Sequence, residues 1–342
     1  MSSDDPLTDR LPVAADVRDA AHRLAGVVRE TPLLAGTPLD EFTGGRILLK
    51  LEPLQLTGSF KVRGAFNRLV QLSPAARRAG VVAFSSGNHA QGVAWAARRL
   101  GVPATIVMPA DAPRAKLENT RALGAEVVTY DRETESREEI ASRIAAERRA
   151  TVVPSFDDPD IIAGQGTVGL ELMQQAAALD LVPDDVVVCC SGGGLVSGCA
   201  LAVRDLAPAA RVYTAEPEAF DDARRSLAAG RRERNQPGGR SICDALQAPS
   251  PGVLTFELMR SLLAGGLAVS DDEVRAAMAW AWRHLKVVVE PGGAVALAAV
   301  LAGRLDARGR TVGVVVSGGN VDRDVFCAAL EAGSQPAFTP RG

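Results

Sequence analysis

Short apolar segments alternate with helical patterns along almost the whole chain, and this alternation restricts the possible folds more than any other feature. Contiguous apolar strands separated by helices indicate parallel sheets that are covered on both faces. An α/β fold is therefore expected, and 342 residues suit two domains or one large unit. The predicted strands are 46–51, 81–85, 104–108, 126–130, 151–153, 186–190, 211–215 and 311–316. The predicted helices are 58–72, 89–100, 114–123, 136–149, 164–178, 195–206, 272–284 and 293–301.

Composition and charge exclude several classes of partner. The net charge is −3 and the chain has no cluster of Lys and Arg, so we expect no nucleic acid partner. We also expect no membrane span, because no run of about 18 apolar residues occurs. The N-terminus lacks a signal-peptide pattern, and the five cysteines lack the spacing of a disulfide framework. These features favour a cytoplasmic protein that acts on a small molecule.

Lys61 is the first candidate for covalent chemistry. The 38 Lys and Arg residues include only four lysines, so 34 are arginines, and a lysine in a Gly- and Ser-rich segment suggests a need for a primary amine. An amine can lose its proton and form a Schiff base, whereas a guanidinium stays charged. A surface lysine at a helix start is the alternative.

Three polar loops follow predicted strands, at the strand ends where parallel sheets bind ligands. Ser191-Gly192-Gly193-Gly194 is typical of an anion cradle of backbone amides at a helix start, although a tight turn would also fit. Segment 85–92 (Ser-Ser-Gly-Asn-His-Ala-Gln-Gly) can grip a carboxylate or simply cap a helix. Segment 317–322 (Ser-Gly-Gly-Asn-Val-Asp) can meet a ligand or form a plain turn.

Two further segments have less specific patterns. Segment 216–222 contains four carboxylates, which could bind a hard cation through oxygen ligands or form a solvated loop. Segment 228–251 is rich in Arg, Gly and Pro and is predicted to be a long surface loop.

Taken together, these segments resemble the fold type II pyridoxal 5′-phosphate (PLP) enzymes, and most closely the branch of threonine/serine dehydratases and serine racemases. The resemblance covers roughly residues 15–330. The strings Thr-Gly-Ser-Phe-Lys-x-Arg-Gly-Ala (57–65) and Ser-Gly-Asn-His-Ala-Gln-Gly (86–92) carry most of it. The strings Ala-Gly-Gln-Gly-Thr (163–167) and Ser-Gly-Gly-Asn (317–320) support it.

The resemblance implies a tryptophan synthase β-like fold. Such proteins have two open, mostly parallel twisted sheets with helices on both faces. It implies a large PLP-binding domain of residues 1–67 and 156–330 and a small substrate-closing domain of residues 68–155. Residues 331–342 are expected to be a disordered tail, and a homodimer is the usual assembly of the family.

The resemblance also implies roles for individual residues. Lys61 would form the Schiff base with PLP, and Ser86 would exchange a proton on the opposite face in racemase-like members. The other expected cofactor contacts are Phe60, Asn88, Gly192, Gly193, Gly194, Leu195 and Ser317. The substrate carboxylate would be bound by Ser86, Gly87, Asn88 and His89. A Mg²⁺ or Ca²⁺ ion would be held by Glu216, the carbonyl of Phe220 and Asp222.

Two features depart from the family pattern. Ser191 stands where a fourth glycine is common, and segment 153–158 lacks a histidine that is common there. The details of the substrate pocket are therefore left open by the resemblance. Arg137 corresponds to a position near the active-site entrance and can pair with a second substrate carboxylate, as in 3-hydroxyaspartate, or can be a surface charge.

The resemblance leads to a PLP-dependent lyase as the expected function. Such an ammonia-lyase, a threonine or serine dehydratase, converts L-threonine, L-serine or a related 3-hydroxy amino acid to a 2-oxoacid and ammonia by β-elimination. A serine or amino-acid racemase is the alternative enzyme. β-Replacement and a non-catalytic PLP-binding protein are further alternatives.

Overall fold

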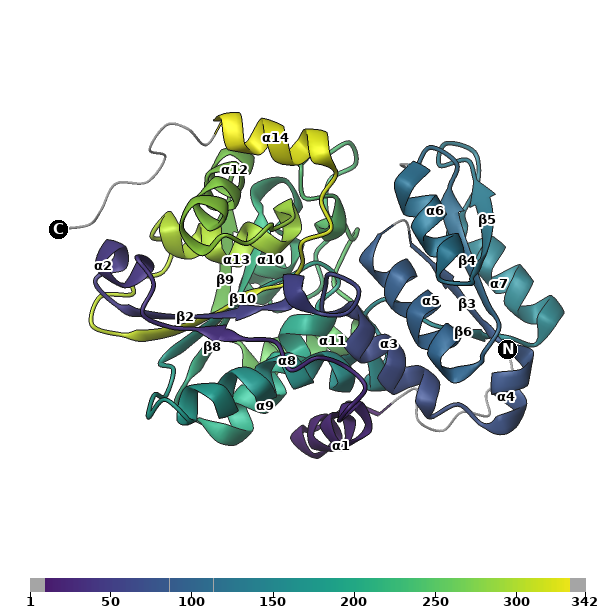
Figure 1. Cartoon of the computed structure of the whole chain (residues 1–342), viewed down its shortest axis with the longest axis horizontal. Helices are drawn as coiled ribbons and strands as arrows, with labels where there is room; N and C mark the ends of the chain where they lie inside the picture. Colours follow the sequence, from purple (N-terminus) through teal and green to yellow (C-terminus); the bar gives the residue numbers. More distant parts are fainter. Residues whose placement is uncertain (1–9, 86, 113, 333–342) are drawn as a thin grey trace.

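A six-stranded sheet forms the larger part of the molecule (Figure 1), and its order is β1-β2-β10-β7-β8-β9 in this computed structural model. Only β1 is antiparallel to its neighbour, and the other pairs are parallel. The strands are β1 (Leu33–Leu34), β2 (Arg46–Leu51), β7 (Asp185–Cys189), β8 (Arg211–Pro217), β9 (Gly265–Val269) and β10 (Thr311–Val316). The central strands β2, β7 and β10 are buried runs of Val, Ile and Leu, as expected where helices cover both faces.

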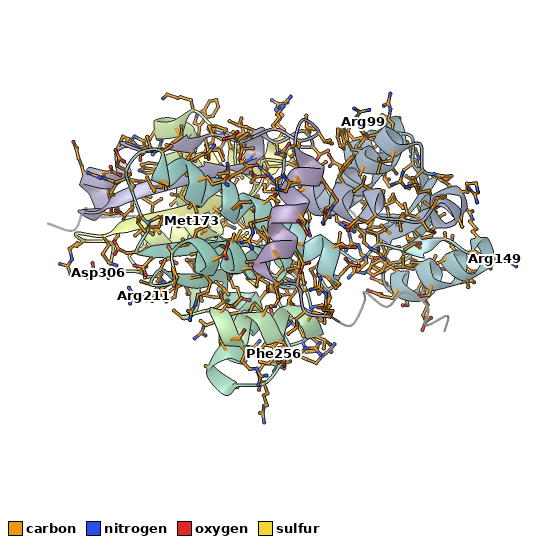
Figure 2. All side chains as sticks on the ribbon, turned by 90° about the horizontal axis from the view of Figure 1, so that it is seen from below. Arg99, Arg149, Met173, Arg211, Phe256 and Asp306 are labelled. Atoms are coloured by element: carbon orange, nitrogen blue, oxygen red, sulfur yellow. The ribbon has the colours of Figure 1, made fainter. Side chains whose placement is uncertain are left out.

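Helices cover the two faces of this sheet in two groups. The helices α8 (Pro159–Ala177), α9 (Gly194–Leu206) and α11 (Val253–Leu262) lie on one face in Figure 1. The helices α10 (Asp222–Ala229), α12 (Asp271–Trp280) and α13 (Pro291–Leu301) lie on the other. The helix α13 is buried along its whole length, since it packs between the sheet and α12. Figure 2 shows Met173 inside this part of the molecule, where its side chain is buried.

A smaller, four-stranded parallel sheet has the order β5-β4-β3-β6. Its strands are β3 (Val81–Phe84), β4 (Ala104–Pro109), β5 (Glu126–Tyr130) and β6 (Thr151–Val152). It is covered by α4 (Pro74–Ala79), α5 (Asn88–Leu100), α6 (Arg114–Ala122) and α7 (Arg137–Arg148), which form a separate lobe in Figure 1. Figure 2 shows Arg149 at the outer edge of this lobe.

The helix α3 (Lys61–Val70) joins the two lobes, because it packs against both α5 and α8. Two glycines allow α3 and α8 to cross closely. A Cβ on Gly64 would lie 2.4 Å from the Gln165 amide, and one on Gly164 would lie 2.6 Å from the Cα of Gly64. The predicted domain boundary at 67/68 falls within α3, so the division at that residue stays a prediction.

The structure describes residues 10–85, 87–112 and 114–332. The predicted tail at 331–342 is wrong at its start, because Glu331 and Ala332 belong to α14 (Arg323–Ala332), and its remainder lies outside the described residues. Within those ranges, no helix is long and apolar enough to cross a membrane. The cytoplasmic location stays a prediction.

All eight predicted strands are present within two residues of their predicted bounds. The predicted helix 272–284 is α12 followed by a π-helical turn (η4, Ala281–Leu285). The sequence patterns missed β1, β9, α2 (Leu39–Thr43), α4, α10, α11, α14 and the N-terminal helix α1 (Ala14–Leu24). The strands β1 and β9 lie at the two edges of the large sheet. Neither has the apolar run on which the strand predictions rest, because β1 has only two residues and β9 begins with two glycines.

Candidate functional site

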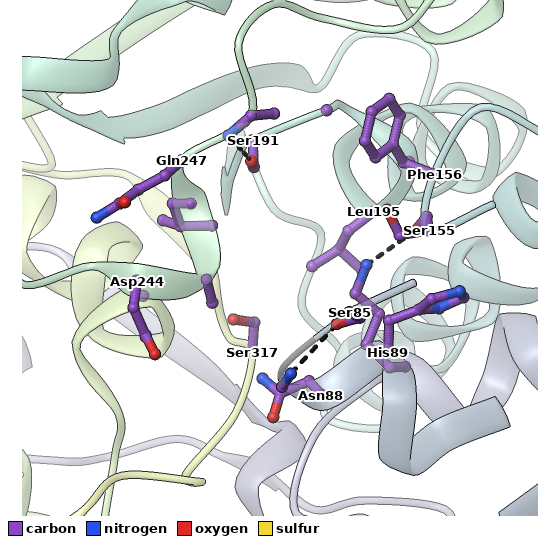
Figure 3. Close-up of a pocket in the computed structure, with 18 of the residues that line it drawn as sticks. Ser85, Asn88, His89, Ser155, Phe156, Ser191, Leu195, Asp244, Gln247 and Ser317 are labelled. Atoms are coloured by element: carbon purple, nitrogen blue, oxygen red, sulfur yellow. Dashed lines mark hydrogen bonds between the residues drawn. The ribbon is translucent and has the colours of Figure 1, made fainter. Parts of the chain in front are cut away.

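A cavity of about 440 Å³ lies between the two lobes, where loops after strands of both sheets meet. It is lined by the start of α3, the loop after β3, the glycine loop after β7 and the loop after β10. Figure 3 shows Asn88, Ser191 and Ser317 around this space. The topology therefore brings together the motifs that lie far apart in the sequence, at the strand ends where parallel sheets bind ligands.

Lys61 is the first residue of α3, and its half-buried side chain faces the cavity. The Lys61 Nζ donates a hydrogen bond of 2.8 Å to the carbonyl of Ser155 and lies 5.2 Å from the centre of the Phe60 ring. Burial removes the Lys61 amine from water and lowers its pKa to about 8, although electrostatic interactions with Cys189 and Glu290 act to raise it. A substantial fraction of this amine is therefore neutral near physiological pH and can attack a carbonyl.

The glycine loop is shaped by contacts that only glycines allow. Gly193 has a φ of +99°, and a Cβ on Gly192 would lie 2.3 Å from the ring of Phe156. The carbonyl of Gly192 accepts hydrogen bonds from the Thr255 hydroxyl (2.6 Å) and the amide of Gly252 (3.1 Å). The helix α9 begins directly after this bend, and its first amides have no acceptor inside the helix, so the loop is suited to an anion.

Ser191 connects the glycine loop to a second wall of the cavity. Its hydroxyl oxygen accepts a hydrogen bond of 3.1 Å from the amide of Ala248. Residues 244–249 line the cavity, and Cys243 and Leu246 are buried. Most of segment 228–251 is a loop, as predicted, and its second half is partly exposed but also lines the cavity. Its Gly, Pro and Arg content does not distinguish a solvated loop from one that covers a cavity.

The loop after β3 places Asn88 at the first position of α5. The Asn88 Nδ2 donates to the Glu290 carboxylate (2.7 Å), and its Oδ1 accepts from the Asn320 Nδ2 (2.8 Å). The Ser85 hydroxyl accepts from the amide of Gly87, at 3.2 Å. The predicted proton donor Ser86 lies outside the described residues.

His89 is buried, and its Nε2 lies 3.0 Å from the carbonyl of Val153. Since that carbonyl can only accept, the ring carries its proton on Nε2, and Nδ1 has no partner in the described part of the chain. Burial, together with the charge on Lys61, lowers the pKa of His89 to about 3. The imidazole is therefore neutral and does not serve as a proton donor at ordinary pH.

Ser317 follows β10 and lines the cavity, as predicted from its motif. Its hydroxyl oxygen accepts a hydrogen bond of 3.2 Å from the Cys189 thiol. Burial raises the pKa of Cys189 to about 11, so the thiol stays protonated and remains a donor. The Ser317 hydroxyl proton is thus directed to another acceptor.

The predicted cation site is not supported. Among the described residues, no group of three or more His, Cys, Asp or Glu side chains is arranged to hold a metal ion. The Glu216 carboxylate accepts hydrogen bonds from the amides of Ala223 (2.9 Å) and Arg224 (2.7 Å), so it caps α10. Asp222 accepts a hydrogen bond from Asn235, and Phe220 is buried beside them. The Asp222 Oδ2, in contrast, is buried and has no partner in the described part of the chain, so a cation held by Glu216, the Phe220 carbonyl and Asp222 stays a prediction.

The cavity has the complementary groups for an aldehyde carried on a flat ring with an anionic arm. Lys61 supplies the amine, the glycine loop supplies an anion cradle, and Phe60 supplies an apolar face. Ser317 and Asn88 supply polar groups at the ring edge. These residues fit PLP, although the contacts of each with the cofactor stay predictions.

Several residues of the site had no sequence signal of their own. Glu290 precedes Pro291 at the start of α13, and nothing local marks its carboxylate as facing Asn88, 202 positions away. The Ser155 carbonyl that accepts from Lys61 is a backbone group, which no residue type can reveal. Asn320 belongs to a recognised motif, but its contact with Asn88 follows only from the folded chain.

Comparison with known proteins agrees with this geometry. Residues 24–318 match a family described as pyridoxal-phosphate dependent enzyme. The chain is 46% identical to an L-threo-3-hydroxyaspartate ammonia-lyase from Pseudomonas sp., over 92% of this chain and 98% of that protein. The crystal structure of a threonine deaminase from T.th. has a TM-score of 0.85 and 45% identity, covering 91% of this chain and 99% of that one. Maize serine racemase has a TM-score of 0.88 and 37% identity, covering 94% and 98%.

Proposed function

Because the chain belongs to the family of pyridoxal-phosphate-dependent enzymes, we propose that it is an ammonia-lyase of the threonine/serine dehydratase type. Its substrate is a 3-hydroxy amino acid, and its products are a 2-oxoacid and ammonia. The observation that carries the proposal is the amine of Lys61, with a pKa lowered to about 8, in a cavity beside a glycine cradle. Relatives named hydroxyaspartate and threonine ammonia-lyase, at 46% and 42% identity, support the reaction type.

Some residues around the cavity bind the cofactor, and others bind the substrate. Lys61 attaches the cofactor, the amides of Gly192–Leu195 hold its phosphate, and Phe60, Asn88 and Ser317 contact its ring. The amides at the start of α5, from Gly87 to His89, bind the substrate carboxylate. When bound, PLP supplies the electron sink that makes the substrate Cα–H bond acidic, while the protein supplies position and charge.

Lys61 is also the base that takes the Cα proton. The hydrogen bond from the Lys61 Nζ to the Ser155 carbonyl would hold the free amine at the wall of the cavity. A pKa of about 8 leaves it partly neutral and able to accept a proton. The neutral His89 cannot compete as an acid, since its pKa is about 3.

The pH dependence of cofactor attachment tests the lowered pKa of Lys61. Only the neutral amine attacks a carbonyl, and its fraction grows as the pH rises through about 8. The rate of PLP attachment to the cofactor-free protein is therefore expected to rise about tenfold per pH unit below pH 8 and to level off above it. Stopped-flow visible absorbance measures this rate. A rise that continues to about pH 10, as for an ordinary lysine, would show that the site does not lower this pKa.

We propose a substrate with a second carboxylate, as in 3-hydroxyaspartate. Arg137 lies at the start of α7 and lines the cavity, with its guanidinium 5.5 Å from the centre of the Phe84 ring. The contact with Phe84 keeps the positive charge of Arg137 at the edge of the cavity. Arg137 also forms an ion pair with the neighbouring Glu138. The relatives named for 3-hydroxyaspartate support the same class.

Replacement of Arg137 by alanine is expected to lower kcat/KM for threo-3-hydroxyaspartate by about 10- to 100-fold, the value of one charge-assisted hydrogen bond. The values for threonine and serine should change little, because neither has a second carboxylate. Arg143→Ala, an exposed arginine on the same helix, is the matched control. Equal losses on all three substrates would exclude a role of Arg137 in selecting the second carboxylate.

A screen for 2-oxoacid release over serine, threonine, both 3-hydroxyaspartate diastereomers and bulkier 3-hydroxy amino acids tests the proposed reaction. The same mixtures should be analysed for D-amino acids, since relatives named serine racemase favour racemisation as the second candidate. In that reaction Ser86 would be the second acid/base. If neither product forms from any of these substrates with PLP-saturated protein, the proposed reaction is wrong.

We also infer that two copies of the chain associate. Trp282 and Val325 are exposed apolar side chains, and the rings of Trp282 and Phe326 form a T-shaped pair with 5.8 Å between their centres. Exposed apolar clusters of this kind are typical of protein interfaces. Light scattering after size-exclusion chromatography would give the mass in solution.

A further inference from the structure

We propose that Asn320 is a positioning residue, which orients the side-chain amide of Asn88 so that Asn88 presents a hydrogen-bond donor to the ring oxygen of the bound cofactor. This inference rests on the proposed function, because it takes PLP as the ligand. Asn320 also lines the cavity, and the role proposed for it acts through Asn88.

The observation is a chain of hydrogen bonds that crosses between the lobes. The Asn320 Nδ2 donates both to the backbone carbonyl of Thr57 (2.7 Å) and to the Oδ1 of Asn88 (2.8 Å). The Nδ2 of Asn88 in turn donates to the Glu290 carboxylate, at 2.7 Å. Asn88 lies in the smaller lobe, at the start of α5, whereas Asn320 and Glu290 lie in the larger.

The donor-to-acceptor direction of these hydrogen bonds is fixed by the groups at the two ends, which accept hydrogen bonds and do not donate them. The Thr57 carbonyl can only accept, so Asn320 must turn its NH₂ group toward it. The Glu290 carboxylate, when ionised, likewise only accepts, so Asn88 must turn its NH₂ group toward Glu290. If the Asn88 amide were rotated by 180°, its NH₂ would face the NH₂ of Asn320 and its oxygen would face a carboxylate.

One hydrogen of the Asn88 amide remains for a ligand. The NH₂ group has two hydrogens, and among the described residues only the Glu290 carboxylate accepts one of them. Asn88 lines the cavity, so the second hydrogen is available there. A donor at this point stabilises the ionised ring oxygen of PLP, whereas the oxygen of a reversed amide would repel it.

Glycines pack closely against the two hydrogen-bond partners of Asn88, which are Asn320 and Glu290. A Cβ on Gly58 would lie 2.3 Å from the Asn320 Oδ1, and one on Gly318 would lie 2.3 Å from the Glu290 Oε1. The Gly319 amide also donates to the Gly58 carbonyl, at 2.9 Å. The segment before Lys61 and the segment after β10 therefore pack against each other beside Asn320. Glycines occur in both motifs because a larger residue would not fit at these contacts.

The test measures cofactor affinity in the Asn320→Asp and Asn320→Ala variants by titrating cofactor-free protein with PLP and following visible absorbance. Asn320→Asp replaces the donor with an acceptor of the same shape, so the Asn88 amide loses its fixed orientation. We expect about tenfold weaker binding of PLP in Asn320→Asp, equivalent to one hydrogen bond to a charged group, and a smaller loss in Asn320→Ala. Asn119→Asp, an exposed asparagine of α6, controls for the added charge.

A double-mutant cycle with Asn88→Ala separates positioning from a general structural effect. If Asn320 acts through Asn88, Asn320→Asp should weaken PLP binding by less than about twofold when Asn88 is already alanine. Effects that multiply, or an Asn320→Asp variant that binds PLP like the unaltered protein, would overturn the inference. Should the variant fold poorly, Asn320→Ala gives the same comparison. If the unaltered protein does not bind PLP, it is the proposed function that fails.

Discussion

Replacement of Lys61 by alanine is expected to reduce 2-oxoacid release by at least about 1,000-fold and to abolish the visible absorbance of the PLP-saturated protein. The loss would be large because, in the proposed reaction, one amine both attaches the cofactor and takes the Cα proton, and general bases alone contribute about 100- to 10,000-fold. Lys61 is the residue whose amine faces the cavity with a pKa lowered to about 8. Activity is measured by keto-acid release, and attachment by borohydride reduction followed by mass mapping of the labelled peptide.

Lys61→Arg is the matched variant, because it keeps the positive charge and the long side chain. A guanidinium stays protonated and forms no Schiff base, so Lys61→Arg should lose colour and activity as fully as Lys61→Ala. Both variants should unfold at nearly the temperature of the cofactor-free parent protein. A Lys61→Ala variant that stayed coloured and active would mean that another group attaches the cofactor.

Replacement of Arg63 by methionine is expected to lower the free energy of unfolding by about 3–5 kcal/mol, as is typical when one member of a buried ion pair is removed. The Arg63 side chain is fully buried and donates two hydrogen bonds each to Glu52 and Glu171. Lys50, which is also buried, donates to the same Glu171, at 2.7 Å. Without Arg63, the buried Glu52 carboxylate loses its charged partner. Urea unfolding followed by circular dichroism measures the change.

Arg114→Met is the matched control for this prediction. Arg114 pairs with Glu118 one turn away on α6, and both side chains are exposed. Pairs of this kind contribute about 0.3–0.5 kcal/mol, so the same substitution should be nearly neutral there. If Arg63→Met were as mild as Arg114→Met, the buried network would contribute little to stability.

The strands and the main site motifs could be predicted from the sequence because their signals are local. Strands β2, β7 and β10 consist mostly of buried apolar residues, which is the pattern of a strand covered on both faces. Lys61 was recognisable as one of only four lysines, in a Gly- and Ser-rich segment, whereas the glycine loop and Ser317 were recognisable because each directly follows a strand. The structure places them around one cavity.

Other features could not be predicted from the sequence because a local pattern does not define its surroundings. The acidic residues near Glu216 resemble a cation site in sequence, yet the Glu216 carboxylate is used by the amides that begin α10. The loop residues 244–249 resemble a solvated segment, yet they form a wall of the cavity. In both cases the deciding contacts come from the way the chain folds back on itself.

By itself, the sequence determined the α/β class and eight of the strands and singled out Lys61 as the candidate amine, since periodicity, glycine placement and residue type are local properties. Only the tertiary structure decided that Glu290 and Asn320 contact Asn88, across 202 and 232 positions. The same is true of the hydrogen bond that the Lys61 amine donates to the Ser155 carbonyl. The physical reason is the packing of two sheets whose strand order differs from their order in the chain. That packing, together with the desolvation it imposes, sets the hydrogen-bond directions and the lowered pKa values on which the chemistry depends.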